Sequence, residues 1–254
     1  MPGIAPAFYV GWLEHRKGVT FAYDYRIAGG EDFHESLQTP FKGLWLGFEI
    51  ESPVSDRLGL SIGGGWLVPG QMDGAVLSDG LRIPFDSHPE YWFLEGMVAL
   101  NPGGGFQVIG GFRWDHFTSR FDVNLSQFQE PQATQDIRAE VYLPFVGVQC
   151  ATPPLTARMI FFPYVPGNIK SVLSFPGRPE AEEFSGGFGE GYFLEFFGEY
   201  RHRMFGEAAI GAFVRWNLLH ARATSDLDLV PFGPPAELTV VFDKRSWTLG
   251  GSFS

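Results

Sequence analysis

The stretch that decides the fold is residues 191–220, GYFLEFFGEYRHRMFGEAAIGAFVRWNLLH. It contains two segments in which every second residue is apolar, joined by a turn around residues 202–205, as expected for a β-hairpin. Each segment is long enough to cross a bilayer, for which roughly 9–11 tilted residues suffice. In the second segment, Ile210, Val214 and Trp216 share the apolar face. We expect these three side chains to face lipid, and Glu207 and Arg215 to face the interior.

The same alternation recurs along the chain and predicts an all-β protein, a single antiparallel up-and-down transmembrane β-barrel over residues 1–254. Short turns at residues 52–56, 101–105 and 151–154 alternate with long segments at residues 29–40, 69–89, 119–135, 165–189 and 221–236. Short periplasmic turns and long outer loops are typical of bacterial outer-membrane barrels. A soluble all-β protein would explain the strands, but not the charged faces that recur opposite full-width apolar bands. We therefore expect the protein in the bacterial outer membrane.

The composition fits a barrel that hides its hydrophobicity by alternation. Of the 254 residues, 44% are hydrophobic and 16% aromatic, yet the mean hydropathy is −0.02. No apolar run approaches the roughly 18 residues of a helical span. The net charge of −11 argues against nucleic acid as a partner, because phosphates demand a basic surface. The single cysteine, Cys150, cannot form an internal disulfide, and we expect no cofactor.

Two strand counts fit the pattern. If residues 7–14 and 19–28 form a hairpin and the tail splits at residues 243–245, there are about twelve strands and both termini lie at the long-loop end. If residues 237–254 form one strand that projects beyond the membrane, there are about ten strands and both termini lie with the short turns. We prefer ten, because barrels of this class keep their termini at the periplasmic end. Residues 1–6 lack the basic region and apolar core of a signal peptide, so we expect the numbering to begin near the mature end.

The face opposite the apolar one carries the residues that we expect to line the interior. These candidates are Asp24, Arg26, Glu49, Glu95, Arg113, Asp115, Arg138, Glu140, Arg158, Glu195, Glu199, Glu207 and Arg215. Because buried charges persist when they are paired, one interpretation is a closed ladder of salt bridges. The other is a polar pore, in which the excess of eight acids over five arginines favours cations. Gly47, Gly63 and Gly111 leave room for water in such a pore, although glycine also marks strand bending.

The arrangement resembles the bacterial outer-membrane β-barrel class over nearly the whole chain and, within that class, the ten-stranded omptins. The likeness lies in strand patterns such as residues 106–117, 142–148 and 206–222. Omptin proteases use an Asp pair from the second outer loop and an Asp–His pair from the fourth. The resemblance therefore points to Asp73 and Asp79, but the fourth loop of this chain has glutamates and no histidine.

Two other histidines offer substitute pairs. His220 precedes Asp226 and Asp228 in the fifth loop, and His116 lies beside Asp115. An imidazole held by a carboxylate can activate water, but we expect both sets to be solvated residues at loop ends rather than catalytic groups. The sequence contains no Gly-x-Ser-x-Gly, no His-Glu-x-x-His and no cluster of Cys and His.

The outer loops are acidic, with Glu31, Asp32, Glu35, Asp73, Asp79, Asp86, Asp122, Glu130, Glu180, Glu182, Glu183, Asp226 and Asp228. Next to an anionic leaflet these loops would be repelled unless divalent cations bridged them, so we expect at most weak Ca²⁺ or Mg²⁺ binding and no dedicated metal site. We expect membrane lipid and lipopolysaccharide as the partners of the barrel.

Three functions stay open. The first is a small-solute channel or transport component with a charged lumen, the second an omptin-like surface enzyme with altered catalytic residues, and the third a non-catalytic adhesion or scaffold barrel. The residues available for a polar lumen, together with the incomplete catalytic set, favour the channel. A continuous water path would support it, and a blocked lumen would support the other two.

Overall fold

The described structure is antiparallel β-sheet throughout. We describe the fold from a computed structural model that places residues 5–14, 19–27, 32–39, 42–68, 70, 72–78, 81–103, 105–123, 133–174, 182–204, 208–227 and 236–254. Across these ranges we find no helix that is long and apolar enough to cross a membrane. The strands form one 14-stranded sheet.

The strands are β1 (Ala5–Glu14), β2 (Val19–Ile27), β3 (Asp32–Thr39), β4 (Lys42–Ser55), β5 (Leu58–Leu67), β6 (Met72–Ser78), β7 (Leu81–Gly103), β8 (Phe106–Val123), β9 (Ala133–Thr152), β10 (Leu155–Phe162), β11 (Gly167–Ser174), β12 (Glu182–Arg203), β13 (Ala209–Leu227) and β14 (Ala236–Phe253). Six of them are continuous tall strands, namely β7, β8, β9, β12, β13 and β14. The other eight lie in line in four pairs, β1 with β2, β3 with β4, β5 with β6, and β10 with β11.

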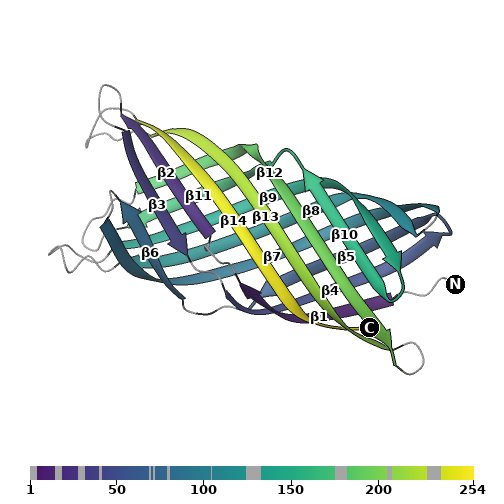
Figure 1. Ribbon diagram of the computed structural model, residues 1–254. Coiled ribbons are helices and arrows are strands. Elements are labelled where there is room, and N and C mark those ends of the chain that lie inside the picture. Colours follow the sequence, from purple (N-terminus) through teal and green to yellow (C-terminus); the bar gives the residue numbers. More distant parts are fainter. Residues whose placement is uncertain are drawn as a thin grey trace.

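Over the described residues these segments make a closed barrel of ten tall strands (Figure 1). The ring closes twice on β14, which pairs with β1 through Trp247 to Phe253 and with β2 through Ala236 to Lys244. The prediction of about ten strands is therefore confirmed, and the alternative of twelve is wrong. Residues 7–14 and 19–28 do not form a hairpin, because β1 and β2 run in the same direction along a single long neighbour.

Ala5, the first described residue, and Ser254 both lie at the end of the barrel that carries the short turns (Figure 1). The strands extend much further into the long segments than we expected. Strand β3 occupies residues 32–39, and β6 and β7 fill most of residues 72–89, all of which we expected to be loop. The reason is that strand pairing continues above the membrane, where the outward face is polar and the apolar band that we used to recognise a strand is absent.

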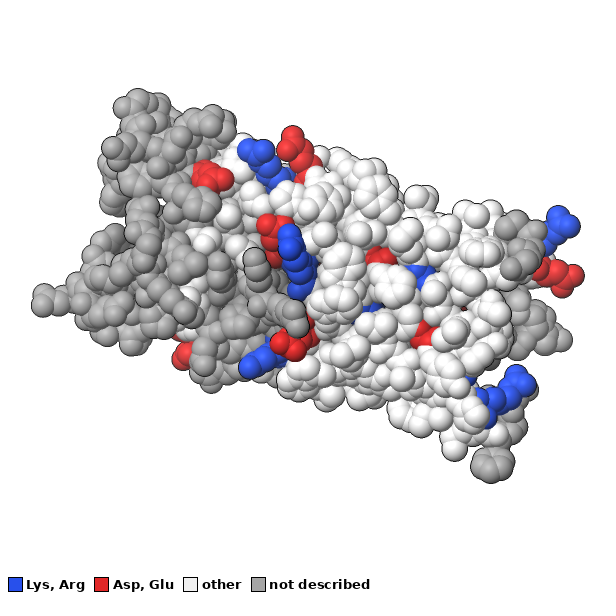
Figure 2. All heavy atoms as spheres, in the orientation of Figure 1, with Lys and Arg blue, Asp and Glu red and all other residues white. Residues whose placement is uncertain are grey.

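The barrel has two halves with opposite polarity. The membrane half contains β1, β4, β5 and β10 with the adjoining parts of the tall strands, and its outer surface is an apolar belt. Exposed side chains of this belt include Phe8, Val10, Trp12, Leu44, Phe48, Ile50, Ile62, Leu94, Val98, Phe112, Val146, Val148, Met159, Phe196, Ile210 and Leu249. Figure 2 shows the belt as a broad region with few charged side chains. Such a surface is suited to the hydrocarbon of a bilayer.

The outer half, which contains β2, β3, β6 and β11, is built the other way round. Its interior is filled by phenylalanines that are at most 4% exposed, namely Phe21, Phe85, Phe117, Phe121, Phe188 and Phe242. The rings of Phe21 and Phe242 stack at 5.1 Å, and those of Phe85 and Phe121 meet edge to face at the same distance. Its outward face carries exposed charges such as Asp86, Arg120 and Asp136. This half is therefore a barrel with an apolar core and a polar outer surface.

Three charged residues that we expected inside the barrel lie on its outer face, because the outer half has the opposite polarity. In β9, Ile137, Ala139, Val141, Leu143 and Phe145 are buried inside the barrel, so Arg138 and Glu140 lie on the outer face of the wall. In β2, Phe21 is buried and Asp24 is exposed on the opposite face. The predictions for Asp24, Arg138 and Glu140 are wrong because we assigned every apolar face to lipid, whereas part of the apolar set fills the barrel.

Lipid exposure of the β12–β13 hairpin can be measured through a substitution at Val214. Val214 lies on the outer face of β13 between Gly198 and Leu249, while Arg215 beside it is 6% exposed inside the barrel. We expect Val214→Arg to lower the free energy of unfolding from lipid vesicles by about 2–4 kcal/mol, the cost of a cation at the midplane. Val214→Leu is the control and should change little. Equal stability of the two variants would contradict a lipid-facing position.

Candidate functional site

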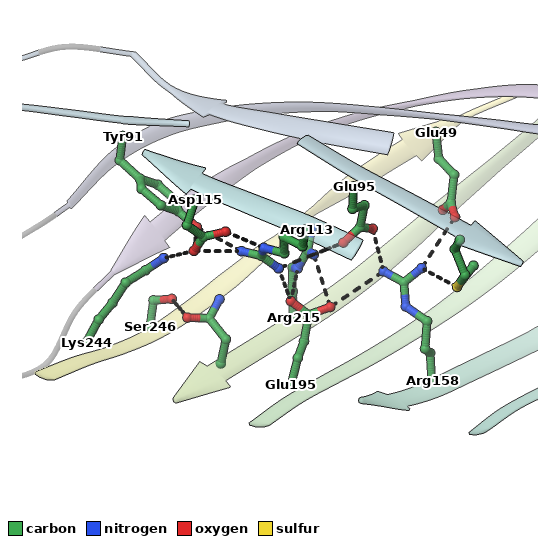
Figure 3. A network of polar contacts seen from close by, with 12 residues as sticks. Glu49, Tyr91, Glu95, Arg113, Asp115, Arg158, Glu195, Arg215, Lys244 and Ser246 are labelled. Atoms are coloured by element: carbon green, nitrogen blue, oxygen red, sulfur yellow. Dashed lines mark hydrogen bonds and ion pairs between the residues drawn. The ribbon is translucent and has the colours of Figure 1, made fainter. Parts of the chain in front are cut away.

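A network of charged side chains lies inside the barrel (Figure 3). Its cations are Arg113, Arg158, Arg215 and Lys244, and its carboxylates are Glu49, Glu95, Asp115 and Glu195. Each side chain is at most 12% exposed, and both Arg113 and Glu195 are fully buried. Four positive and four negative charges balance, as burial requires. We call this set the lumen network.

Glu195 lies at the centre of the lumen network. Its carboxylate accepts a hydrogen bond from Arg113 Nη1 at 2.6 Å and two from Arg215, from Nε at 2.7 Å and Nη2 at 3.0 Å. The third arginine, Arg158, places Nη2 3.5 Å away. Arg113 also donates from Nε to Asp115 and from Nη2 to the Tyr91 hydroxyl, at 2.8 Å in the second case. One carboxylate thus binds three guanidinium groups from three different strands.

Three ion pairs of the network span the barrel from wall to wall. Glu49 on β4 pairs with Arg158 on β10 at 3.4 Å, and Glu95 on β7 pairs with Arg215 on β13 at 3.3 Å. Asp115 on β8 accepts a hydrogen bond from Lys244 on β14 at 3.1 Å. In each case the two strands are five positions apart in a ring of ten, so they face each other. Side chains from opposite walls therefore meet in the middle of the lumen.

Aromatic rings pack above and below these guanidinium groups. Arg113 Cζ lies 3.8 Å and Arg215 Cζ 4.3 Å from the centre of the Phe93 ring, within the range of cation–π contacts. Trp45 stacks on Phe93 at 6.4 Å. Every one of the ten tall strands contributes an interior side chain that is at most 6% exposed, namely Leu13, Trp45, Leu67, Phe93, Arg113, Leu143, Ile160, Phe193, Arg215 and Lys244. The interior at this level is packed.

Two glycines, Gly47 and Gly65, make room for Trp45. A Cβ atom on Gly65 would lie 2.4 Å from Trp45 Cζ2 and 2.6 Å from Phe93 Cε1, closer than packed atoms approach. We expect Gly65→Ala to destabilise the barrel by about 1–3 kcal/mol through overpacking, and to change the near-ultraviolet circular dichroism of the tryptophans. Gly59→Ala on the same strand is the control, since its Cβ would meet only Ala99, at 3.8 Å. A Gly65→Ala spectrum and melting curve like those of wild type would contradict this packing.

The residues that we considered for catalysis do not assemble into a site in the described part of the chain. His220 points outward, with Nδ1 2.7 Å from Asp243 and its ring stacked 5.3 Å from that of Tyr192. Asp79 and Asp228 lie outside the described residues, as do the side chains of Asp73 and Asp226. Nor do three or more His, Cys, Asp or Glu residues of the described chain gather to hold a metal ion.

His116 and Asp115 are neighbours in sequence but lie on opposite faces of the wall. Asp115 belongs to the lumen network, whereas the His116 ring stacks on Trp92 at 4.8 Å on the outer surface. His116 Nδ1 is 3.5 Å from Glu140, which accepts a hydrogen bond from the Tyr142 hydroxyl at 2.8 Å and others from Arg138. With Trp114, these residues form an aromatic and polar girdle at the boundary between the two halves.

Three other residues were expected in the interior, and the structure describes the side chain of one of them. Glu199 lies inside, 4% exposed, and accepts a hydrogen bond from Arg201 Nε at 2.8 Å. Glu207 and the side chain of Arg26 lie outside the described residues. We missed Lys244, Tyr91 and Arg201. The sequence could have placed Lys244 inside, because it lies two residues from both Phe242 and Ser246 and therefore on the same face of the last strand.

Comparison with known proteins places the fold. No protein-family model and no curated protein sequence matches the chain. The structure of the outer membrane protease OmpT from Escherichia coli is similar to this one, with a TM-score of 0.67 at 8% sequence identity. The match covers 98% of this chain and 96% of the OmpT chain. OprG from Pseudomonas aeruginosa has a TM-score of 0.45 at 11% identity over 99% and 95% of the two chains. The translocator domain of the autotransporter NalP from Neisseria meningitidis has 0.47 at 9% over 98% and 88%.

The closed wall, the apolar belt and the match to OmpT define the class of the protein. It is a bacterial outer-membrane β-barrel, with the short turns and the two ends of the described chain at the same end of the barrel. Within that class its wall of about ten strands has the OmpT-like form, and this likeness concerns the fold alone. The predicted fold class and location are confirmed.

Proposed function

We propose that the protein is a closed outer-membrane barrel that displays its outer loops at the cell surface as a binding scaffold. The observation that carries the proposal is the set of three ion pairs that join opposite walls, Glu49–Arg158, Glu95–Arg215 and Asp115–Lys244. A path for solutes along the axis would have to break them. A barrel closed in this way leaves its outer surface and loops as the parts able to meet a partner outside the cell.

The outer half supports this proposal because it has its own apolar core. Its stacked phenylalanines bury the interior, and its outward face is charged, so it suits a rigid support that projects into water. The chain segments at the far end would then be held away from the membrane surface. Display of loops on a rigid barrel is a common way for a fold to carry a binding function.

The proposed display is tested by epitope labelling on intact Gram-negative cells. A short epitope inserted between β8 and β9 should bind antibody on intact cells, whereas the same epitope between β12 and β13 should bind only after the outer membrane is permeabilised. Both fusions should keep the heat-modifiable migration of a folded barrel. Labelling of the β12–β13 site on intact cells, or of neither site, would contradict the proposal.

A small-solute channel is the second candidate. It is favoured by the charged lumen and by a cavity of about 380 Å³ below the lumen network, on the periplasmic side. Conduction would require the three cross-lumen ion pairs to separate together, with the cost of leaving buried charges unpaired. We therefore place the channel second, and electrical measurement distinguishes it from the closed barrel.

Proteolysis is expected to be absent or feeble. The fourth outer loop has no histidine, and His220 pairs with Asp243 on the outer wall. A cluster of carboxylates stays ionised near neutral pH and supplies no base poised to activate water. Purified folded protein should therefore leave basic peptides intact in a chromatographic assay. Robust cleavage that His220→Ala abolishes would instead support the omptin-like enzyme.

We also propose membrane lipid and lipopolysaccharide as partners of the barrel wall, with weak binding of divalent cations at the acidic loops. The apolar belt suits acyl chains, and the girdle of Trp92, Trp114, His116 and Tyr142 suits the headgroup region. Arg138 and Lys170 are two exposed cations of the wall, and they pair with Glu140 and Glu183. Their charges suit the phosphates of an anionic leaflet.

A further inference from the structure

The periplasmic side of the lumen network is hollow. The cavity of about 380 Å³ is lined by eight of the ten tall strands, from Ala5 on β1 to Phe197 on β12. Its roof is Arg158, whose guanidinium belongs to the lumen network and lies 5.3 Å from the Phe197 ring. A second cavity, beside the turn at Asp56, shares Pro53, Gly59, Ala99 and Gln107 with it. The hollow is thus a blind chamber that opens towards the periplasm, and we call it the periplasmic chamber.

Two buried polar side chains in the chamber lack a partner. Gln149 and Ser61 are each 8% exposed, and neither makes a side-chain hydrogen bond to another described residue. They come from β9 and β5, which are three positions apart in the ring of ten strands. Both side chains are therefore available to a molecule in the chamber.

Among the charged side chains that line the chamber, one carboxylate has no cationic partner in the described chain. Glu199 pairs with Arg201 at 2.8 Å, and Glu49 pairs with Arg158 at 3.4 Å. Arg201 Nη2 also donates to the Tyr9 hydroxyl at 3.0 Å, so both arginines of the lining are engaged. Glu51 lines the same chamber, is exposed, and has no ion-pair partner in the described chain. The chamber therefore favours a ligand that brings one positive charge.

We propose that the periplasmic chamber is a binding site for a small polar amine of about the size of an amino sugar. Glu51 would receive the ammonium group, and Gln149 and Ser61 would exchange hydrogen bonds with hydroxyl or amide groups of the ligand. The volume lies within the roughly 300–1,000 Å³ of small-molecule sites. Met97 and Phe197 supply an apolar wall against which a carbon ring can pack. This site does not depend on the outer loops, so it stands or falls independently of the proposed display function.

Binding is tested by titrating the purified protein in detergent micelles with glucosamine and putrescine as amines and glucose as the neutral match. We expect saturable binding of glucosamine in calorimetry and about tenfold weaker binding of glucose, as the loss of one charge-assisted hydrogen bond implies. Glu51→Gln should weaken glucosamine binding by a similar factor. Glu90→Gln, on the outer surface of β7, is the matched control and should bind as wild type does. Absence of saturable binding by both amines would overturn the proposal, as would equal affinity in the Glu51→Gln variant.

The location is tested separately by cysteine labelling. In a Cys150→Ser background, Gln107→Cys places a thiol on the wall of the chamber, where a methanethiosulfonate reagent should modify it. Saturating glucosamine should slow the modification about tenfold, because the ligand and the reagent compete for the same space. Unchanged labelling in the presence of bound glucosamine would place the ligand elsewhere and overturn the assignment to the chamber.

Discussion

Replacing Glu195 with Gln should lower the free energy of unfolding of the barrel by about 3–5 kcal/mol, the cost of breaking a buried ion pair from one side. The glutamine has almost the same shape, but it loses the negative charge that faces Arg113, Arg158 and Arg215. Its amide NH₂ group would also point at guanidinium donors, which cannot accept a hydrogen bond. Urea unfolding from phospholipid vesicles, followed by tryptophan fluorescence, measures the effect.

Glu190→Gln on the same strand is the matched control. The Glu190 side chain is 76% exposed and lies 3.9 Å from Arg222, so its removal should change stability by no more than about 1 kcal/mol. If Glu195→Gln and Glu190→Gln unfold at the same urea concentration, the lumen network does not stabilise the barrel, and the buried pairing described above is contradicted.

Arg113→Ala and Arg138→Ala should differ greatly, although the sequence places both arginines on faces that we first assigned to the lumen. Arg113 is fully buried between Asp115 and Glu195 and packs on Phe93, so we expect a loss of about 3–5 kcal/mol. The Arg138 side chain is 60% exposed on the outer wall, where its pair with Glu140 should contribute about 1 kcal/mol or less. Unfolding in vesicles compares the two directly.

The same pair of variants also distinguishes the two interpretations of the lumen. In a conducting pore, Arg113→Ala would leave an acid unpaired and raise the current or the preference for cations. In a closed barrel it should chiefly lower stability, and Arg138→Ala should do neither. Equal stability losses for the two variants would show that Arg138 is as buried as Arg113 and would contradict the orientation of β9.

The membrane-spanning strands and their count follow from local periodicity, which is why the sequence predicts them, whereas it misses strands of the outer half such as β3 and β6. The alternation of residues 191–220 reappears as β12 and β13, with Glu195 and Arg215 inside and Ile210 outside. The choice of ten strands required one further step, that residues 237–254 form a single strand long enough to pair with both β1 and β2.

The interior could not be predicted in the same way, because it depends on contacts across the barrel. Periodicity shows which face a residue occupies, but not whether that face is the lipid side, as Ile137 and Arg138 illustrate. It also does not show which charges meet across the lumen. Lys244 lies in a run of three charged residues, which is typical of a turn. In the structure this run is part of β14 and pairs with β13 and β2, so that the Lys244 side chain lies inside the barrel and contacts Asp115.

The most direct test of the closed lumen is a planar lipid bilayer recording of the purified, folded protein in a salt gradient. We expect no conductance steps from wild type at any voltage that the bilayer tolerates, because three ion pairs and a packed aromatic layer join opposite walls. Insertion is checked in parallel by protection of the barrel from protease in vesicles. Reproducible ohmic steps with a reversal potential set by cations, enlarged in Arg113→Ala, would contradict the closed barrel and establish the channel.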